Sequence, residues 1–293
     1  MILIISNIIG GLGNQMFQYA AGRALAYEKN LKFRIDDSDY QNYNLHKFEL
    51  IKVFNLPVKL AEKADLSAIL GWRSSKNVMR LLKNQNLSWL RGAHYIAEPH
   101  FNYWSDIVHV PISCYLLGYW QSEKYYKKIE SQIRHDFKFK DNFSNFNNFL
   151  IEKIKSTNSI SLHIRRGDYI SNSVANSNHG VLPIDYYINS IEYITQRVTK
   201  PKFFIFSDDI DWVKSNLPIK FPFEYVEHNR GSQSFNDMRL ISQCRHHIIA
   251  NSTFSWWGAW LNPDPRKIVV APRRWFANDR NIQDLFPQSW VVL

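Results

Sequence analysis

The stretch ILIISNIIGGLGNQMFQYAAGRAL occupies residues 2–25, and its hydrophobic pattern changes once along its length. Residues 2–9 form an almost continuous apolar run, which is typical of a strand buried on both faces. Gly-Gly-Leu-Gly follows at 10–13, and after it the apolar residues recur at helical spacing. A strand, a glycine turn and a helix in this order indicate an α/β unit, and residues 31–35 are the next expected strand.

The second half of the chain repeats this alternation. We expect strands at 159–164, 202–206, 247–250 and 267–271, and helices at 185–197, 237–244 and 254–261. Strands that alternate with helices predict parallel sheets of the doubly wound kind. The polar segment 138–148 separates the two halves and is the expected linker.

The composition excludes several classes of protein. Hydrophobic residues make up 45% of the 293 residues and charged residues 21%, which excludes a disordered chain. The two cysteines, Cys114 and Cys244, exclude a disulfide framework and a cysteine-based zinc site. No apolar run approaches the ~18 residues of a membrane span, and the apolar start lacks the features of a signal peptide. We therefore expect a cytoplasmic protein.

The formal net charge is +10, from 36 Lys and Arg against 26 Asp and Glu. A basic balance predicts a polyanionic partner, either nucleic acid, an anionic membrane surface or a phosphorylated substrate. No nucleic-acid-binding motif occurs and the charge is not gathered in one module, so we expect no nucleic-acid partner.

The glycine turn is the first segment that carries chemistry. Its backbone N–H groups can approach an anion at the amino end of the following helix. A dinucleotide fingerprint would need a third glycine at Met16, so nicotinamide binding is disfavoured. A tight turn without a ligand stays an alternative.

The second such segment is SLHIRRGDY at 161–169, where an expected strand ends in charged residues. Doubly wound sheets bind ligands at the carboxyl ends of their strands. Arg165 and Arg166 can neutralise a diphosphate through bidentate hydrogen bonds. A solvated surface pair is the alternative for two adjacent arginines, but their position at a strand end favours a binding site.

Two further turns follow later strands. Residues 207–209 read SDD, which suits the N-cap of a helix. Residues 248–260 read IIANSTFSWWGAW, in which small hydroxyl residues open a helix and offer a second anion-binding N-terminus.

Four segments, taken in order, are similar to one family. GGLGNQMFQYA (10–20), HIRRGDY (163–169), SDD (207–209) and the segment 237–261 resemble the bacterial α-1,2-fucosyltransferases of glycosyltransferase family 11. The resemblance implies a GT-B arrangement of two Rossmann-like α/β domains with parallel sheets facing a central cleft. The acceptor-side domain would span 1–140 and the GDP-fucose-binding domain 150–293.

The resemblance also implies an activity and a source. L-Fucose would pass from GDP-fucose, with inversion, to O2 of galactose in an oligosaccharide or an O-antigen glycolipid. No metal ion or other cofactor would be required, and the protein would be bacterial.

Site residues follow from the same resemblance. The implied donor-binding residues are Gly11, Gly13, Asn14, Gln15, His163, Arg165, Arg166, Ser207, Asp208, Asp237, Asn251, Ser252, Thr253, Phe254 and Ser255. Without a metal, the two arginines would stabilise the leaving diphosphate, and Asp237 would accept two hydrogens from the guanine edge. The expected acceptor-side contacts are Trp120, Gln121 and Glu123.

A transfer with inversion at the fucose anomeric carbon requires that the acceptor hydroxyl lose its proton. Asp168 is one candidate base, with a structural role as its alternative. The loop 170–183 contains no acid, and His179 is its only residue that titrates near neutral pH. A dissociative transition state with late proton loss would need no strong base.

The segment 73–91 is basic and interleaved with apolar residues. No acid occurs between Asp65 and Glu98, and the spacing of Arg73, Lys76, Arg80 and Lys83 places them on one face of an expected helix. A basic amphipathic helix can dock on anionic lipid, so we expect peripheral association with the cytoplasmic face of a membrane. A solvated helix face is the alternative.

Three other functions stay open. Asp209 and Asp211 form an Asp-x-Asp pattern, which would hold a divalent ion in a metal-dependent sugar transferase. A sugar-nucleotide-binding protein without catalysis is the second alternative. A basic nucleic-acid-binding protein is the third.

Overall fold

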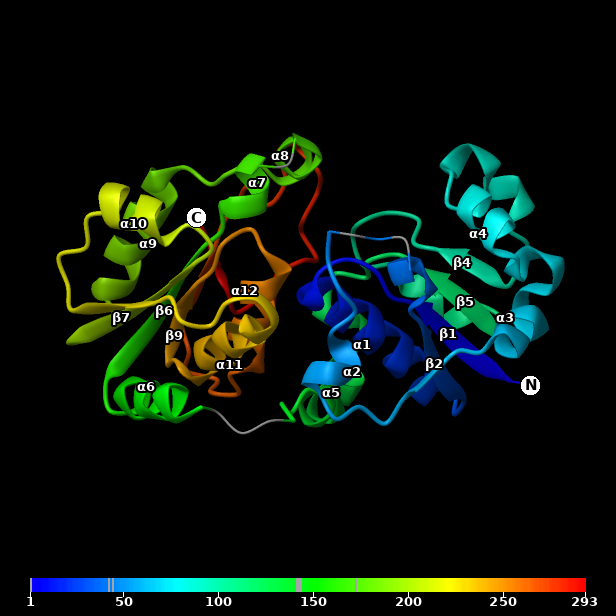
Figure 1. The fold of residues 1–293 in the computed structure, drawn as a ribbon, viewed down its shortest axis with the longest axis horizontal. Helices are drawn as coiled ribbons and strands as arrows, with labels where there is room; N and C mark the ends of the chain where they lie inside the picture. Colours follow the sequence, from blue (N-terminus) through cyan, green and yellow to red (C-terminus); the bar gives the residue numbers. More distant parts are fainter. Residues whose placement is uncertain (1, 42, 44, 141–143, 172) are drawn as a thin grey trace. The chain divides into compact units, whose positions relative to one another are not determined.

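The computed structural model describes residues 2–41, 43, 45–140, 144–171 and 173–293, and for residues 168, 171, 174 and 175 it describes the backbone alone. The chain divides into two compact units. Unit 1 comprises residues 1–140 and 281–285, and unit 2 comprises residues 141–280 and 286–293. Each unit has a parallel sheet and helices of its own (Figure 1).

Unit 1 is built on a five-stranded parallel sheet with the order β3-β2-β1-β5-β4. The strands are β1 (Leu3–Asn7), β2 (Lys32–Asp36), β3 (Lys59–Leu60), β4 (Tyr95–Ala97) and β5 (Cys114–Leu117). The helices are α1 (Leu12–Glu28), α2 (Leu50–Val53), α3 (Lys63–Leu70), α4 (Lys76–Leu82) and α5 (Glu130–Asp136).

The central strand β1 is apolar on both faces, and all five of its residues are buried. Leu3 and Ile5 pack with α3 and α4, whereas Ile4 packs with Ala21 and Leu25 of α1. Successive side chains of a strand point to opposite faces, so helices cover both faces of this sheet. The continuous apolar run at 2–9 predicts this double coverage.

Unit 2 is built on a six-stranded parallel sheet with the order β11-β10-β9-β6-β7-β8. The strands are β6 (Asn158–Ile164), β7 (Pro201–Ser207), β8 (Phe223–Val226), β9 (His246–Ile248), β10 (Val269–Ala271) and β11 (Val291–Val292). The helices are α6 (Asn145–Lys155), α7 (Gly167–Ser171), α8 (Ser173–His179), α9 (Ile184–Thr195), α10 (Ile210–Asn216), α11 (Phe235–Gln243) and α12 (Thr253–Leu261).

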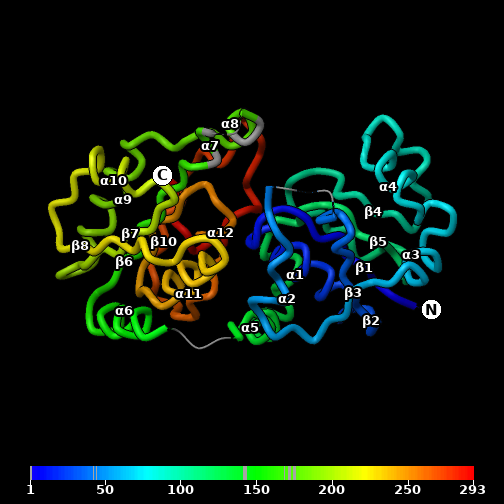
Figure 2. The backbone as a smooth tube through the Cα atoms, viewed as in Figure 1, coloured from blue at the N-terminus to red at the C-terminus, as the bar shows by residue number. Residues whose placement is uncertain are grey.

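Helices cover both faces of this second sheet as well. Residues of α9 and α10 pack with Ile160 and Leu162 of β6, whereas residues of α6 and α11 pack with Phe204 and Phe206 of β7. Figure 2 shows α9 and α10 on one side of this sheet and α6 and α11 on the other. The predicted parallel α/β class is therefore confirmed in both halves of the chain.

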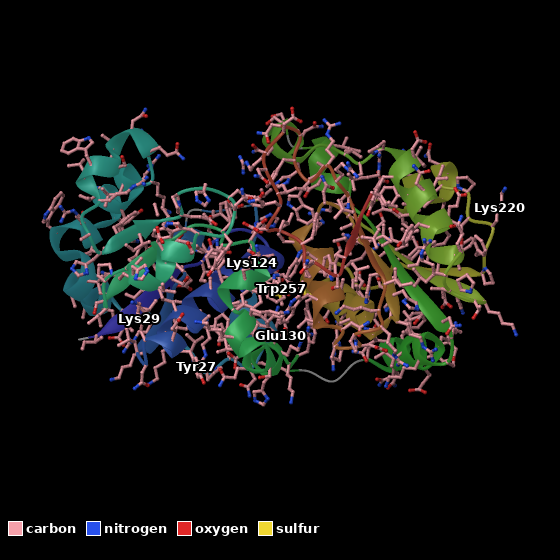
Figure 3. All side chains as sticks on the ribbon, turned by 180° about the vertical axis from the view of Figure 1, so that it is seen from behind. Tyr27, Lys29, Lys124, Glu130, Lys220 and Trp257 are labelled. Atoms are coloured by element: carbon pink, nitrogen blue, oxygen red, sulfur yellow. The ribbon has the colours of Figure 1, made fainter. Side chains whose placement is uncertain are left out.

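The tryptophans of α12 belong to the core of unit 2. Trp256, Trp257 and Trp260 are at most 2% exposed, and the ring of Trp256 lies 5.3 Å from that of Trp290 between centroids. Figure 3 shows Trp257 among packed side chains and the exposed Lys220 at the rim of the same unit. Burial of several indoles explains the tryptophan-rich sequence of this helix.

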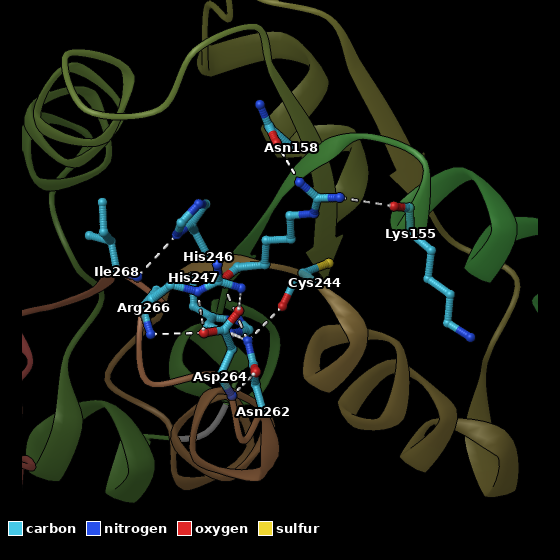
Figure 4. A network of polar contacts seen from close by, with 10 residues as sticks. Lys155, Asn158, Cys244, His246, His247, Asn262, Asp264, Arg266 and Ile268 are labelled. Carbon is cyan, nitrogen blue, oxygen red and sulfur yellow. Dashed lines mark hydrogen bonds and ion pairs between the residues drawn. The ribbon is translucent and has the colours of Figure 1, made fainter.

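A buried Ser-His-Asn set joins β6, β9 and the end of α12. Figure 4 shows His247 and Asn262 of this set beside Cys244 and Asp264. The Asn262 Oδ1 accepts from the Asp264 N–H at 2.9 Å, so its Nδ2 donates to the Cys244 carbonyl and to His247 Nε2. His247 Nδ1 therefore donates to Ser161 Oγ, at 2.8 Å. An imidazole that donates to a serine cannot remove its proton, so the set is structural and is not an activated nucleophile.

The segment 281–285 belongs to unit 1 although it lies late in the sequence. The Asp284 carboxylate accepts from the backbone N–H of Tyr103 at 3.1 Å and forms an ion pair with Lys124 at 2.5 Å. Ser122 Oγ donates to the Asp284 carbonyl at 2.6 Å. The chain then returns to unit 2, where β11 pairs with β10.

The single helix expected across the basic segment is wrong. Within 73–91 the structure has one short α-helix, α4, flanked by the 3-10 turns η2 (Gly71–Ser74) and η3 (Gln85–Leu90). Gly71 has φ +58° and Ser75 has extended backbone angles, so the helical path is interrupted twice before Lys76. Arg73 consequently lies in the turn before α4 and not on its face. No helix of the described residues combines the length and the hydropathy needed to cross a membrane.

Candidate functional site

Three turns of unit 2 carry most of the predicted site residues. They follow β6, β7 and β9, which are neighbours in the sheet and run parallel. Their carboxyl ends therefore meet at one edge, the edge at which open α/β sheets bind ligands. Arg165 and Asp208 come directly after β6 and β7, and Asn251 comes three residues after the end of β9.

The two arginines are each held by an aspartate of the next turn. Arg165 Nη1 lies 3.1 Å from Asp208 Oδ2, and Arg166 Nε lies 3.3 Å from Asp209 Oδ2. The backbone N–H of Arg166 donates to Asp208 Oδ1 at 2.9 Å. The Arg166 guanidinium also stacks on the ring of Trp212. These contacts orient both cations before any anion binds.

Gly167 permits this close approach of the two turns. A Cβ at this position would lie 2.9 Å from Asp208 Oδ2, which is shorter than any ordinary contact. A side chain at 167 would therefore push Asp208 away from the Arg165–Arg166 backbone.

His163 is the last polar residue of β6 and is 5% exposed. Burial, with a smaller contribution from Arg165, lowers the pKa of His163 to about 3. Its imidazole is therefore neutral near physiological pH. The buried Nδ1 atom has no hydrogen-bond partner among the described residues. Because buried polar atoms are normally hydrogen-bonded, this atom is a candidate for contact with a ligand.

The aspartates after β7 cap α10. Asp209 Oδ1 accepts from the Trp212 N–H at 3.3 Å, while Oδ2 pairs with Arg166. Ser207 Oγ accepts from the Asp209 N–H at 3.0 Å. Asp211 is exposed in the first turn of the helix. Both oxygens of Asp209 are thus engaged within the protein, in agreement with the predicted N-cap.

The turn after β9 is held by buried side chains. Asn251 Nδ2 donates to the carbonyls of His179 and Gly180, each at 3.1 Å, while its buried Oδ1 has no partner among the described residues. Ser252 Oγ accepts from the Phe254 N–H as the N-cap of α12. The buried Ser255 hydroxyl bonds to backbone carbonyls. Thr253 and Phe254 are half-buried at the start of the helix, where the positive end of its dipole lies.

Asp237 lies in the first turn of α11 and has a strongly perturbed carboxyl group. Burial raises the pKa of Asp237 to about 7, and Asn229 Nδ2 donates to its Oδ1 at 2.8 Å. Sequence reasoning did not identify Asn229, because a lone asparagine after a short strand carries no pattern. It anchors this carboxylate and also bonds to Asn147 at 3.0 Å.

Of the two candidate bases, Asp168 and His179, the structure describes the side chain of His179 alone. Asp168 lies in α7, and its side chain is outside the part of the chain that the structure describes. His179 ends α8 and stacks on Tyr169, with ring centroids 5.1 Å apart, and on Phe276 at 5.5 Å. Tyr169 in turn donates its hydroxyl to the Asn251 carbonyl at 2.9 Å, which ties α7 to the turn after β9.

The predicted residues of unit 1 lie at the start of α1 and after β5. Gly10 has φ +86°, a conformation that favours glycine, and Gly11 is the N-cap of α1. Gly13 follows in the first turn of the helix. The Gln15 side chain is fully buried and bonds to the backbone of residues 10, 47, 49 and 50. It therefore shapes the glycine turn.

Asn14 is joined to the turn after β5. Gln121 Nε2 donates to Asn14 Oδ1 at 3.0 Å, while the buried Gln121 Oε1 has no partner among the described residues. Trp120 is buried with φ +54°, and the Glu98 carboxylate accepts from its backbone N–H at 2.9 Å. Glu123 pairs with Lys127. Among the described residues, no three His, Cys, Asp or Glu side chains are grouped so that they could hold a metal ion.

Comparisons with known proteins agree on one family. The family model described as Glycosyl transferase family 11 matches residues 69–293. An alpha-1,2-colitosyltransferase of Escherichia coli is 35% identical, over 99% of this chain and 99% of its own. An O-antigen biosynthesis glycosyltransferase of Escherichia coli, WbnK, is also 35% identical, over 98% of this chain and 99% of its own.

The fold is similar to that of a solved fucosyltransferase. The crystal structure of NodZ alpha-1,6-fucosyltransferase soaked with GDP-fucose matches with a TM-score of 0.56 and 15% sequence identity, over 92% of this chain and 94% of that chain. The predicted GT-B fold class is confirmed by this likeness and by the two parallel α/β sheets.

Proposed function

Because the chain belongs to glycosyl transferase family 11, we propose that it transfers L-fucose from GDP-fucose to O2 of a galactose residue, with inversion and without a metal ion. The arrangement of Arg165 and Arg166 at the carboxyl edge of the unit 2 sheet carries this proposal. Two oriented guanidinium groups are the stabilisation that a leaving diphosphate needs when no metal ion binds it.

The reaction breaks the bond between the fucose C1 and the diphosphate oxygen and forms a bond from C1 to the acceptor O2. The diphosphate takes the electron pair, and the acceptor hydroxyl loses its proton. Arg165 and Arg166 stabilise the charge that develops on the leaving group, because Asp208 and Asp209 hold them in place and little reorganisation is needed.

Asp237 and His163 recognise the guanosine in this proposal. A carboxylate accepts the two N–H groups of the guanine Watson–Crick edge, one on each oxygen. Asn229 occupies one lone pair of Asp237 Oδ1, which leaves the other lone pair of Oδ1 and the whole of Oδ2 for that role. The neutral His163 offers its buried Nδ1 to the nucleoside. The amino end of α12 supplies backbone N–H groups that favour an anion.

The acceptor proton goes to Asp168 or to His179. The variants D168N and H179N separate these two candidates. Removal of the true base abolishes the limb of the pH–rate profile that reports its ionisation, whereas removal of a structural residue lowers the rate without changing the shape of the profile. A profile unchanged by both substitutions supports late proton loss without a base.

Colitose is the second candidate sugar, because a 35% identical relative is an alpha-1,2-colitosyltransferase. Colitose is 3,6-dideoxy-L-galactose and so lacks the 3-hydroxyl of L-fucose. A site that hydrogen-bonds this hydroxyl discriminates strongly against the sugar without it. The ratio of kcat/KM for GDP-fucose and GDP-colitose decides between the two donors.

The first experiment is incubation with GDP-fucose and a panel of galactosides in the presence of EDTA. We expect GDP release and a product heavier by one deoxyhexose, with linkage analysis locating the new bond on O2. Loss of activity in EDTA that manganese restores would contradict the metal-independent mechanism and favour Asp209 and Asp211 as ligands. GDP binding without turnover on any acceptor or donor would favour a non-catalytic binding protein. An O-antigen repeat unit belongs in the panel because of the role named for WbnK.

A further inference from the structure

The segment 66–97 of unit 1 presents two tryptophans to solvent. Trp89 is 76% exposed and Trp72 is 62% exposed, which makes them the two most exposed large hydrophobic side chains of the described residues. Leu81 of α4 is 56% exposed. An exposed indole is unusual in a protein whose other tryptophans include several that are fully buried, and it indicates an interaction surface.

Arg73 connects the turns that carry the two indoles. Its guanidinium lies 4.6 Å from the centre of the Trp72 ring, and its Nε donates at 2.6 Å to the carbonyl of Leu90, the residue after Trp89. Gly92, with φ +72°, lets the chain pass close to this group, since a Cβ there would lie 3.2 Å from Arg73 Cζ. The turns η2 and η3 are therefore held together, and both indoles belong to one region.

Helix α4 contributes cations to the same region. Its Met79 and Leu82 are buried against the sheet, so the opposite face carries Lys76 and Arg80, four residues apart and both exposed. Figure 1 shows α4 at the periphery of unit 1. The exposed surface thus combines apolar and basic side chains.

The charge of this region is almost uncompensated. Segment 66–97 contains five Lys and Arg residues and no Asp or Glu. Lys83 forms an ion pair with Asp39, but Arg73, Lys76, Arg80 and Arg91 form none with the described acids. Arg91 donates to the carbonyl of Leu82 at 2.9 Å and lies over the Tyr95 ring, 5.9 Å from its centre. The hydrogen bonds of Arg73, Lys76 and Arg91 go to neutral oxygen atoms, so none of them cancels the positive charge of this region.

We propose that this surface, Trp72, Arg73, Lys76, Arg80, Leu81 and Trp89, docks peripherally on an anionic lipid bilayer. Indoles are enriched at the level of lipid headgroups, and Lys and Arg beside them bind anionic headgroups. The two exposed indoles beside cations favour a lipid surface, because in a bilayer the layer that indoles prefer lies next to the anionic headgroups. Docking goes beyond sugar transfer and depends on none of the residues proposed for it.

The test is sedimentation of the full chain with vesicles of phosphatidylcholine, alone or mixed with phosphatidylglycerol. We expect binding to the mixed vesicles, weakened by salt, and little binding to phosphatidylcholine alone. Equal binding to both vesicles, or binding to neither, overturns the proposal. Binding to neither would direct attention to a protein partner.

Two variants locate the binding surface. K76Q/R80Q should lower the partition coefficient on anionic vesicles about 30-fold, from about 1 kcal/mol per charge. W72Q/W89Q should lower it about tenfold or more and abolish quenching of fluorescence by brominated lipid in the docked protein. The matched controls are K32Q/K220Q, which removes two exposed lysines, and Y27Q, which removes an exposed aromatic ring.

Unaltered binding in both test variants overturns the assignment to this surface, and so does an equal loss in the controls. Thermal unfolding and the rate of transfer to a water-soluble acceptor show that each variant is folded. Vesicle binding contains no donor or acceptor, so its failure is distinguishable from a failure of the proposed transferase activity.

Discussion

The guanidinium carbon of Arg166 lies 3.6 Å from the centroid of the Trp212 ring. The stacking partner belongs to α10, which follows β7, while the arginine follows β6. Asp209 caps that same helix and binds the same arginine. One short helix therefore fixes both the plane and the in-plane direction of the guanidinium, which a lysine ammonium could not reproduce.

Replacement of Arg166 by lysine should reduce activity although the charge is kept. We expect R166K to lower kcat/KM for GDP-fucose about 30- to 1000-fold, about 2–4 kcal/mol of transition-state stabilisation. Most of the loss should fall on kcat, because the charge on the diphosphate develops in the transition state. Steady-state kinetics with a fixed acceptor measures both constants.

The control for this substitution is R197K. The Arg197 guanidinium also stacks on an aromatic ring, 3.7 Å from the centre of Tyr193, but precedes β7 and so lies at the amino edge of the sheet. Activity should be unchanged in R197K. Equal losses in R166K and R197K would contradict a specific role for Arg166.

Donor binding should weaken as the pH falls through 7. The pKa of Asp237 is about 7 because the carboxyl is buried, so the protonated acid, which cannot accept both guanine N–H groups, predominates at lower pH. The Kd of GDP-fucose, whose diphosphate is esterified at both ends, should rise about tenfold per pH unit below 7. D237N should bind weakly at every pH; a pH dependence that persists in D237N would disprove this role.

The same carboxyl should make the wild-type protein less stable at high pH. Its pKa in the folded state is raised from 3.8 to about 7, so the stabilising contribution of the protonated form is lost as the pH rises through this window. The loss amounts to about 4 kcal/mol at most. Denaturant unfolding should show D237N to be more stable than the wild type at pH 8 and of similar stability near pH 4. Equal stabilities at pH 8 would show that the carboxyl is not desolvated.

The bond from Gln121 to Asn14 should matter for turnover more than for folding. Q121M keeps the size of the side chain but removes the 3.0 Å bond that orients Asn14. We expect kcat/KM to fall about 5- to 20-fold while the free energy of unfolding changes by about 1 kcal/mol. Q85M, at an exposed glutamine of the same unit, should alter neither quantity. Changes that are confined to stability would contradict the acceptor-side role expected for Gln121.

Packing of α11 on α12 should not tolerate a methyl group at Gly258. A Cβ there would lie 2.5 Å from Cγ2 of the buried Ile241, so overpacking outweighs the gain in helix propensity. We expect G258A to lose about 1–2 kcal/mol of unfolding free energy. In the double variant with I241A, which removes the clashing methyl, the two losses should be less than additive; simple additivity would exclude the clash.

The sequence alone predicts the features that follow from hydrophobic periodicity and from the residues at strand ends. The apolar run at 2–9 and the charged end of 161–169 locate the sheets and the turn with Arg165 and Arg166, because parallel strands bring such turns to one edge. Asp209 as an N-cap is likewise local chemistry.

Contacts between distant residues could not be predicted in this way. Asn229 reaches Asp237 only because β8 ends beside α11 in the folded unit, and Gln15 meets residues 47–50 through a loop of ordinary composition. The sequence also does not predict the interruption of the helix at Ser75. The spacing of the basic residues is helical. The positive φ of Gly71 and the extended backbone of Ser75 nevertheless break the helix before Lys76.

The return of residues 281–285 to unit 1 has a consequence for chimaeric enzymes. Because the bond network of Asp284 belongs to unit 1 while β11 completes the sheet of unit 2, no single cut in the chain separates the two units. A hybrid that exchanges residues 1–140 between relatives would join Tyr103, Ser122 and Lys124 of one parent to the Asp284 position of the other. Exchange of the whole of unit 1 by recombination therefore requires two further crossovers, one before residue 281 and one after residue 285.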